Sequence, residues 1–183
     1  TRHIDPEILS MYGAGYAPAG YSWLANEARL KGYDLSILEK AGLVSIKENG
    51  KVYDRFVDRI VFPFYSLSGQ VIGFTGRALG TDPQCKYLNS PETSLFHKGK
   101  TLFGIYQARP EISKADKCYL VEGQFDVLSF VQYSLPNTVC GSGTALTLDQ
   151  VRMIKKFTRN VTAIYDGDAA GMKASVRNMD ILL

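Results

Sequence analysis

The sequence predicts an α/β protein in which a mixed α+β N-terminal part is followed by a parallel sheet. From Cys118 onward, short apolar runs alternate with helical patterns in the order β-α-β-α-β-α, which is typical of parallel strands joined by helices. Earlier in the chain, Asn49 and Gly50 lie between two apolar runs, which is a strong signal for an antiparallel hairpin. The sequence therefore predicts two kinds of sheet.

The last strand and helix of the predicted parallel sheet enclose a pair of carboxylates. Val161–Tyr165 is a short run of apolar, β-branched and aromatic residues, which predicts a strand that ends at Asp166 and Asp168. Ligands of open α/β sheets bind outside the carboxyl ends of the strands, and carboxylates suit Mg²⁺. Alternatively, both aspartates only form a turn and a helix cap. The helix that follows has four apolar residues on one face: Met172, Val176, Met179 and Leu183.

A second stretch repeats this pattern. Cys118–Val121 predicts a strand that ends in Glu122 and a glycine, and a helical pattern follows with Asp126 in its first turn. Two parallel strands would bring Glu122, Asp166 and Asp168 to one edge of a sheet, where their mutual repulsion favours a bound cation. The alternative is that Glu122 caps the helix after it, at the positive end of the helix dipole.

The N-terminal part predicts short helices and antiparallel strands. A helix is expected to start at Asp5, because Pro6 and Glu7 suit the first turn of a helix. Pro63 in the expected strand Ile60–Tyr65 indicates an edge or bulge position, because proline has no N–H donor. The other expected elements are helices over Tyr21–Lys31 and Leu35–Ala41 and strands over Leu43–Ile46, Val52–Tyr53 and Gln70–Thr75.

The middle of the chain is polar and basic, and glycine and proline punctuate it. Lys86–Thr93 and Phe96–Lys100 are expected to be loops, and a helix over Leu102–Arg109 is expected to end at or soon after Pro110. The later expected elements are a strand over Thr138–Cys140, a flexible loop over Gly141–Thr144 and a helix opened by a capping box at Thr147–Gln150, with Leu148, Val151 and Ile154 on one face.

The composition is ordinary for a soluble globular protein, with 183 residues, 45% hydrophobic and 21% charged. No apolar run is long enough to span a bilayer and no signal peptide opens the chain, so a membrane protein is not expected. Cys85, Cys118 and Cys140 match neither a disulfide framework nor zinc-ligand spacing, which indicates a reducing, cytoplasmic setting. Because the chain begins at Thr1 without a methionine, we expect an excised fragment.

The net charge of +3 is unevenly distributed along the chain. Residues 1–50 carry −1, residues 51–117 carry +4 and residues 118–183 carry 0. The positive excess therefore lies in the middle, while the carboxylates lie in the last third. This arrangement suits an anionic substrate held beside a metal site, although a solvated basic face would look the same.

A series of motifs, in this order and spacing, resembles the RNA polymerase domain of bacterial DnaG-type DNA primases over nearly the whole chain. A lone Asp-Gly-Asp would be a weak signal, but the ordered set is specific. The motifs are Tyr53–Phe56 with Arg59, Val71–Phe74 with Gly76 and Arg77, Lys86–Thr93, Phe96–Lys100, Val121–Gly123 with Asp126, and Tyr165–Asp168 with Ala170 and Gly171.

The resemblance implies a basic N-terminal subdomain over residues 1–116 and a Toprim-type parallel-sheet subdomain, truncated at the C-terminus, over residues 117–183. It implies that Glu122, Asp166 and Asp168 are catalytic and bind metal, with Asp126 as a supporting acid. It also implies a set of basic residues that contact template, nucleotide or product phosphates: Arg55, Arg59, Arg77, Lys86, Lys98 and Lys100, with Arg2 as a less secure match.

The implied activity is RNA primer synthesis on single-stranded DNA with Mg²⁺ or Mn²⁺. The implied partners are the DNA template, NTPs and the RNA primer, and no membrane. The family's zinc-binding module, its helicase-binding region and a further Asp-rich motif lie outside this chain, so no zinc site is expected here. Two alternatives stay open: a Toprim nuclease or topoisomerase-like protein that cleaves phosphodiesters with the same acids, and a non-catalytic module that binds single-stranded DNA.

Overall fold

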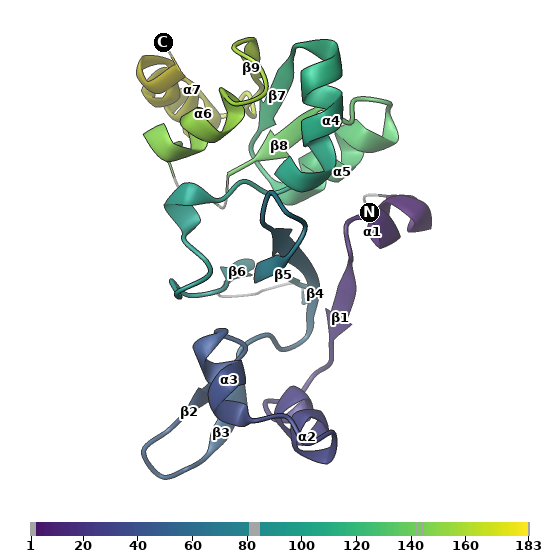
Figure 1. Ribbon diagram of the computed structural model, residues 1–183, viewed down its shortest axis with the longest axis vertical. Helices are drawn as coiled ribbons and strands as arrows, with labels where there is room; N and C mark the ends of the chain where they lie inside the picture. The colour runs from purple at the N-terminus through teal and green to yellow at the C-terminus, as the bar shows by residue number, and fades with distance from the viewer. Residues whose placement is uncertain (1–2, 81–84, 142, 144, 183) are drawn as a thin grey trace. The chain divides into compact units, whose positions relative to one another are not determined.

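The parallel sheet that the sequence predicts is present in the computed structural model, which describes residues 3–80, 85–141, 143 and 145–182. Strand β7 (Cys118–Val121) lies between β8 (Thr138–Cys140) and β9 (Val161–Ala163), and both neighbours are parallel to it. Helices α5 (Gln124–Gln132), α6 (Leu148–Ile154) and α7 (Ala169–Leu182) follow the three strands in turn (Figure 1). The expected β-α-β-α-β-α order is confirmed, while the expected loop over Gly141–Thr144 lies partly outside the described residues.

The chain divides into two compact units, each assembled from separate stretches of sequence. The parallel-sheet unit comprises Thr1–Tyr12, Phe64–Gln70 and Lys98–Leu183, and the antiparallel-sheet unit comprises Gly13–Pro63 and Val71–His97. Helix α1 (Pro6–Met11), which begins after Asp5 as expected, belongs to the first of these units. The expected subdomain boundary after residue 116 stays a prediction.

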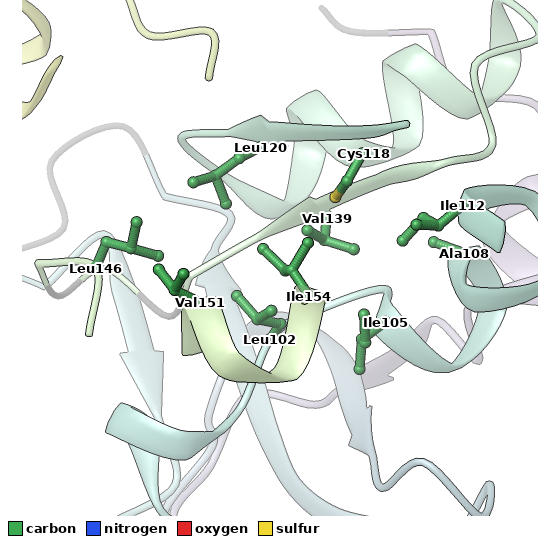
Figure 2. Close-up of a cluster of buried hydrophobic side chains, with 10 residues drawn as sticks. All are labelled: Leu102, Ile105, Ala108, Ile112, Cys118, Leu120, Val139, Leu146, Val151 and Ile154. Carbon is green, nitrogen blue, oxygen red and sulfur yellow. The ribbon is translucent and has the colours of Figure 1, made fainter. Parts of the chain in front are cut away.

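Helices cover both faces of the parallel sheet, as buried parallel strands require. Cys118 and Leu120 lie two residues apart on β7 and point to the same face, where Figure 2 shows them gathered with Val139 and with side chains from α4 and α6. On the other face, the ring of Tyr119 lies 6.2 Å from the ring of Phe130 in α5. The buried cluster on the first face consists of Leu102, Ile105, Ala108, Ile112, Cys118, Leu120, Val139, Leu146, Val151 and Ile154.

A helix is present where one was expected over Leu102–Arg109, but α4 (Ile105–Ala115) starts later and runs through Pro110, so the expected end near Pro110 is wrong. A proline inside a helix costs about 3 kcal/mol, because it removes one hydrogen bond and crowds the preceding turn. Ile105 and Ile112 are both buried in the cluster described above, and burying each side chain contributes roughly 1.5–3 kcal/mol. Core packing therefore offsets the unfavourable proline.

The antiparallel-sheet unit contains the predicted hairpin and a sheet of four strands. Strands β2 (Val44–Ile46) and β3 (Val52–Asp54) pair across the Asn-Gly turn, which confirms the hairpin. The sheet has the order β1-β4-β5-β6. Its strands are β1 (Gly15–Ala17), β4 (Arg59–Tyr65), β5 (Val71–Ala78) and β6 (Tyr87–Asn89), and the helices of the unit are α2 (Trp23–Leu30) and α3 (Leu35–Lys40).

One expectation for this part of the chain agrees with the structure and one is wrong. Strand β4 lies between β1 and β5, but β1 pairs only with Arg59–Val61, so Pro63 lies beyond that ladder, in agreement with the expected edge position. The expected loops contain short regular elements, β6 and the 3-10 helix η1 (Lys98–Lys100). Strand β6 forms by pairing with β5, a long-range contact that a polar local sequence does not reveal.

Two helix faces also differ from expectation. The capping box of α6 is present, yet Leu148 is 60% exposed while Val151 and Ile154 are buried. In α7, Met172 and Val176 are exposed by 62% and 68%, so this half of the predicted apolar face is not buried. The side chain of Met179 and residue Leu183 lie outside what the structure describes. Among the described residues, no helix has the length and apolar character needed to cross a membrane.

Candidate active site

The parallel sheet brings two of the predicted acids to one edge. Glu122 directly follows β7, and Asp166 follows the neighbouring strand β9. The backbone N–H of Asp166 donates to Glu122 Oε2 at 3.3 Å, and both residues are exposed. Because the two strands are parallel and adjacent, their carboxyl ends meet at the same edge, as the sequence predicts.

The third acid, Asp168, caps the helix that follows it. Its Oδ1 accepts a hydrogen bond from the N–H of Gly171 at 2.8 Å, the geometry of a side chain at a helix N-cap. The capping role considered for Asp168 is therefore present. A carboxylate has two oxygens, so capping is compatible with a metal-binding role. Gly171 lets the chain turn tightly here, because a Cβ at that position would overlap the carbonyl oxygen of Asp166.

The supporting acid Asp126 fixes the turn that carries Glu122. Asp126 Oδ2 accepts a hydrogen bond from the N–H of Gly123 at 3.0 Å, three residues earlier in the chain. Gly123 is the N-cap residue of α5, so the capping alternative considered for Glu122 is not what the structure shows. Asp126 therefore supports Glu122 by holding the backbone that follows it.

The donor chemistry of this edge suits a hard divalent cation, because carboxylate oxygens are the ligands such ions prefer. Within the described ranges of the chain, no three His, Cys, Asp or Glu side chains lie close enough together to hold a metal ion. Glu122 and Asp166 approach each other through a backbone amide, while Asp168 is oriented by its helix cap. The structure thus places Glu122 and Asp166 at one sheet edge, and the described residues do not assemble a complete ligand set.

A cavity of about 240 Å³ lies beside Glu122 in the parallel-sheet unit. Tyr165, Arg177 and Asn178 line it together with Glu122. Burial raises the pKa of Tyr165 above its ordinary value, so the hydroxyl keeps its proton at neutral pH. The sequence analysis missed Arg177 and Asn178, because polar residues within a helical pattern give no sign of which neighbours they meet.

Four of the predicted basic residues lie in the antiparallel-sheet unit: Arg55, Arg59, Arg77 and Lys86. Arg59 Nη2 donates to the carbonyl oxygen of Cys85 at 2.9 Å, and its Nη1 donates to the carbonyl oxygens of Gly76 and Lys86 at 3.3 and 3.4 Å. The guanidinium of Arg77 lies 5.6 Å from the centre of the Tyr87 ring. The structure therefore brings Arg59, Arg77 and Lys86 together across β4, β5 and the start of β6.

Glycine at position 76 makes room for Arg59. A Cβ there would lie 2.8 Å from Phe56 Cδ1 and 3.1 Å from Arg59 Cδ, both closer than ordinary contact. The side chain of Arg59 thus crosses β5 at a place where only glycine leaves space. The motif glycine before Arg77 therefore has a physical reason that the sequence alone did not supply.

Arg55 borders a separate cavity of about 600 Å³ in the same unit. Arg55 Nη2 donates to the carbonyl oxygen of Asn89 at 3.1 Å, and burial lowers the pKa of its guanidinium, although arginine stays protonated in proteins. Tyr21 and Tyr53 also line this cavity, and Lys47 is balanced there by Glu39 and Asp54, so the lining combines aromatic rings with charges of both signs.

Lys98 and Lys100, the last two predicted basic residues, lie on η1 in the parallel-sheet unit. Gln150 of α6 is fully buried and its Nε2 donates to the carbonyl oxygens of Lys98 and Thr101 at 3.0 and 2.9 Å. Sequence reasoning assigned Gln150 only to the capping box and missed this contact. Arg2 lies outside the described residues.

Comparison with known proteins identifies the family to which this arrangement belongs. Residues 1–109 match the model of the DNA primase catalytic core, N-terminal domain. The chain belongs to the DnaG-type DNA primase family. Residues 119–183 match a Toprim-like family, which agrees with the parallel sheet and its acidic edge. Membership of a Toprim-containing primase family implies the use of a divalent metal.

Relatives and solved structures agree with this family. A DNA primase of Clostridium acetobutylicum is 41% identical over 182 residues, which is 99% of this chain and 30% of the relative. The crystal structure of the Aquifex aeolicus primase (zinc-binding and RNA polymerase domains) is 37% identical with a TM-score of 0.91, and the match covers 98% of this chain and 44% of that one. A DnaG primase catalytic domain bound to single-stranded DNA is 37% identical with a TM-score of 0.85, over 98% of this chain and 58% of that one. The chain thus spans about a third of the length of the curated relatives it matches.

Proposed function

We propose that this chain is part of a catalytic core that synthesises RNA primers on single-stranded DNA. The observation that carries the proposal is the meeting of Glu122 and Asp166 at the carboxyl edge of the parallel sheet, within a chain of the primase family. The structure of a related catalytic domain bound to single-stranded DNA supports the choice of template.

The acidic edge would hold the cofactor. Glu122, Asp166 and Asp168 would bind Mg²⁺ or Mn²⁺, which when bound favours ionisation of the attacking 3′-hydroxyl and neutralises charge on the phosphate oxygens. Asp126 keeps the turn after Glu122 in place through its hydrogen bond to Gly123. The acids would thereby supply the negative charge that holds the metal, and the metal's positive charge would offset that of the triphosphate.

The basic residues would hold the nucleic acid and the nucleotide. Arginine forks orient phosphate oxygens in pairs, and lysines and arginines along a groove bind a single strand with little sequence preference. The proposed contacts are Arg55, Arg59, Arg77, Lys86, Lys98 and Lys100. NTPs and the RNA primer are the other proposed partners. A replicative helicase would dock through segments outside this chain, and we place the reaction in the cytoplasm.

Removing one acid from a full-length primase that carries this sequence tests the proposal. Glu122→Gln and Asp168→Asn should each lower primer synthesis from NTPs by about 100-fold or more, because the metal supplies several kcal/mol of charge stabilisation. The measurement is the yield of radiolabelled primer on a single-stranded template at fixed Mg²⁺. Asp149→Asn, which alters an exposed acid paired with Arg152 on α6, is the matched control and should retain full synthesis.

The same variants separate the other two functions. Full synthesis by both acid variants would contradict the assignment of the site. Metal-dependent nicking without synthesis would favour a Toprim nuclease, and single-strand binding that ignores both metal and the acids, with no synthesis, would favour a binding module. Family membership does not favour either alternative.

A further inference from the structure

A partly buried contact ties the loop of the two aspartates to the body of α7. The Asn178 amide lies 2.6 Å from the Tyr165 hydroxyl, with Nδ2 placed as the donor. Tyr165 directly precedes Asp166, whereas Asn178 lies nine residues beyond the first residue of α7. Asn178 is only 4% exposed. The contact therefore connects the acidic loop to a buried position on the helix that follows.

The chemistry of the amide makes Tyr165 its main anchor. Asn178 Oδ1 is buried and has no hydrogen-bond partner among the described residues. An asparagine amide can be flipped so that its oxygen takes the place of its nitrogen. A donor–acceptor distance of 2.6 Å is usual for an O–H···O hydrogen bond but short for an N–H···O one. With the amide turned, the Tyr165 hydroxyl donates to Oδ1. In either orientation, the tyrosine hydroxyl is what holds this buried amide in place.

Two other hydrogen bonds hold the loop. The N–H of Asp166 donates to the exposed carboxylate of Glu122, and Asp168 caps α7 through Gly171. Side chains at exposed positions compete with water for their hydrogen bonds more than buried ones do. Of the side chains in these three contacts, Glu122 and Asp168 are exposed and Asn178 is buried, and Tyr165 and Asn178 border the cavity that Glu122 also lines.

We propose that Asn178 is a positioning residue that acts through the Tyr165 hydroxyl. Its contact with Tyr165 fixes the backbone where the chain leaves β9, and this backbone places Asp166 and Asp168 for divalent metal binding. This inference rests on the proposed function of the three acids. Groups that orient metal ligands without touching the metal typically change metal affinity by 10–100-fold when removed. The effect on metal affinity should therefore exceed any effect on global stability.

Tyr165→Phe tests the proposal by removing one hydroxyl and keeping the ring. In a full-length primase that carries this sequence, we expect Mn²⁺ to bind about tenfold more weakly to the acidic site, as measured by electron paramagnetic resonance titration. The melting temperature should stay within about 2 °C of the parent. Tyr119→Phe is the matched control, because Tyr119 lies on β7 and packs against Phe130 of α5, on the other face of the sheet from the core cluster.

Asn178→Ala provides a second, independent variant. It should weaken Mn²⁺ binding to a similar extent. The double variant, Tyr165→Phe with Asn178→Ala, should bind Mn²⁺ no more weakly than the single variant of lower affinity, because both changes remove the same contact. Circular dichroism of each variant shows whether α7 stays folded, and Tyr165→Phe still decides the matter if Asn178→Ala unfolds it.

The outcomes separate this inference from the proposed function. If Asp168→Asn abolishes Mn²⁺ binding while Tyr165→Phe binds like the parent, the positioning role is wrong and the site assignment stands. An equal loss in Tyr119→Phe would show a general structural effect and overturn the positioning role. If Glu122→Gln, Asp166→Asn and Asp168→Asn all keep full Mn²⁺ affinity, the proposed function itself fails.

Discussion

The predicted acids of one unit and the predicted arginines of the other are held in opposite ways. In the parallel-sheet unit, the predicted acids accept hydrogen bonds from backbone N–H groups where strands end and helices begin. In the antiparallel-sheet unit, Arg55 and Arg59 donate to backbone carbonyl oxygens along a sheet. The acids therefore use the N–H groups of turns and helix starts, and the arginines use the C=O groups of strands and the segments beside them.

The two arrangements also differ in the sequence separation between each charged side chain and the residue that it hydrogen-bonds. Asp126 and Asp168 are held by residues three positions away, whereas Arg59 and Arg55 are held by carbonyls 17 and 34 positions away. The acids thus depend mainly on local turns, and the arginines depend on correct pairing of distant strands. Mutations that disturb a turn should affect metal binding, and mutations that disturb strand packing should affect nucleic-acid binding.

Among substitutions that leave the charged side chains of both sites in place, the largest expected effect comes from Gly171→Ala in the parallel-sheet unit. The added Cβ would overlap the Asp166 carbonyl oxygen, so the acidic loop and the start of α7 must move apart. We expect a loss of about 2–3 kcal/mol in unfolding free energy in urea, typical of an overpacked site. Mn²⁺ affinity should fall at least about tenfold.

Gly167→Ala is the control for this prediction. Gly167 lies in the same loop, but a Cβ there would meet no atom within 4 Å. It should leave both stability and Mn²⁺ affinity within about twofold of the parent protein, since surface changes are usually small. Equal losses in the two variants would show that the loop tolerates no side chain at all and that the close approach at Gly171 is not the cause.

An intermediate effect is expected from Gly76→Ala in the antiparallel-sheet unit. The added Cβ would press on Phe56 and on Arg59, displacing the arginine from its three carbonyl partners. Single-stranded DNA affinity, measured by fluorescence anisotropy, should fall roughly tenfold, which corresponds to about 1.4 kcal/mol. Mn²⁺ affinity should not change. Gly80→Ala, where a Cβ meets no atom within 4 Å, should bind DNA normally.

The smallest expected effect comes from Lys86→Ala. Lys86 is exposed, so its loss removes at most one phosphate contact and no packing. The slope of log affinity against log salt should become shallower by about 0.7, the value expected for one contact to a single strand. Lys31→Ala, which removes an exposed lysine at the C-cap of α2, should leave the slope unchanged. An unchanged slope in Lys86→Ala would remove Lys86 from the DNA interface.

The acidic edge could be predicted from the sequence because its signals are local. An apolar run, an acid, a glycine and a helical pattern occur within about fifteen residues, and parallel strands bring two such stretches to the same edge. Glu122 and Asp166 accordingly meet where expected. The same logic gave the order of strands and helices from Cys118 onward.

The features that the sequence could not predict depend on distant partners. Pro110 lies inside α4 because Ile105 and Ile112 reach a core formed later in the chain. Strand β6 forms only against β5. Gln150 and Asn178 are buried amides whose partners lie elsewhere in the sequence, and an amide within a helical pattern looks like a solvent-facing residue. Long-range packing overrides local preference at each of these positions.

The buried Gln150 also sets an order of assembly for the chain. It holds the carbonyls of Lys98 and Thr101, which precede it by 52 and 49 residues. Closing so long a loop costs entropy before any contact forms, so contacts of this kind form late in folding. The basic turn at Lys98 and Lys100 therefore takes its final shape only after α6 has been synthesised and folded. Resistance of that turn to trypsin would then report that α6 has docked against it.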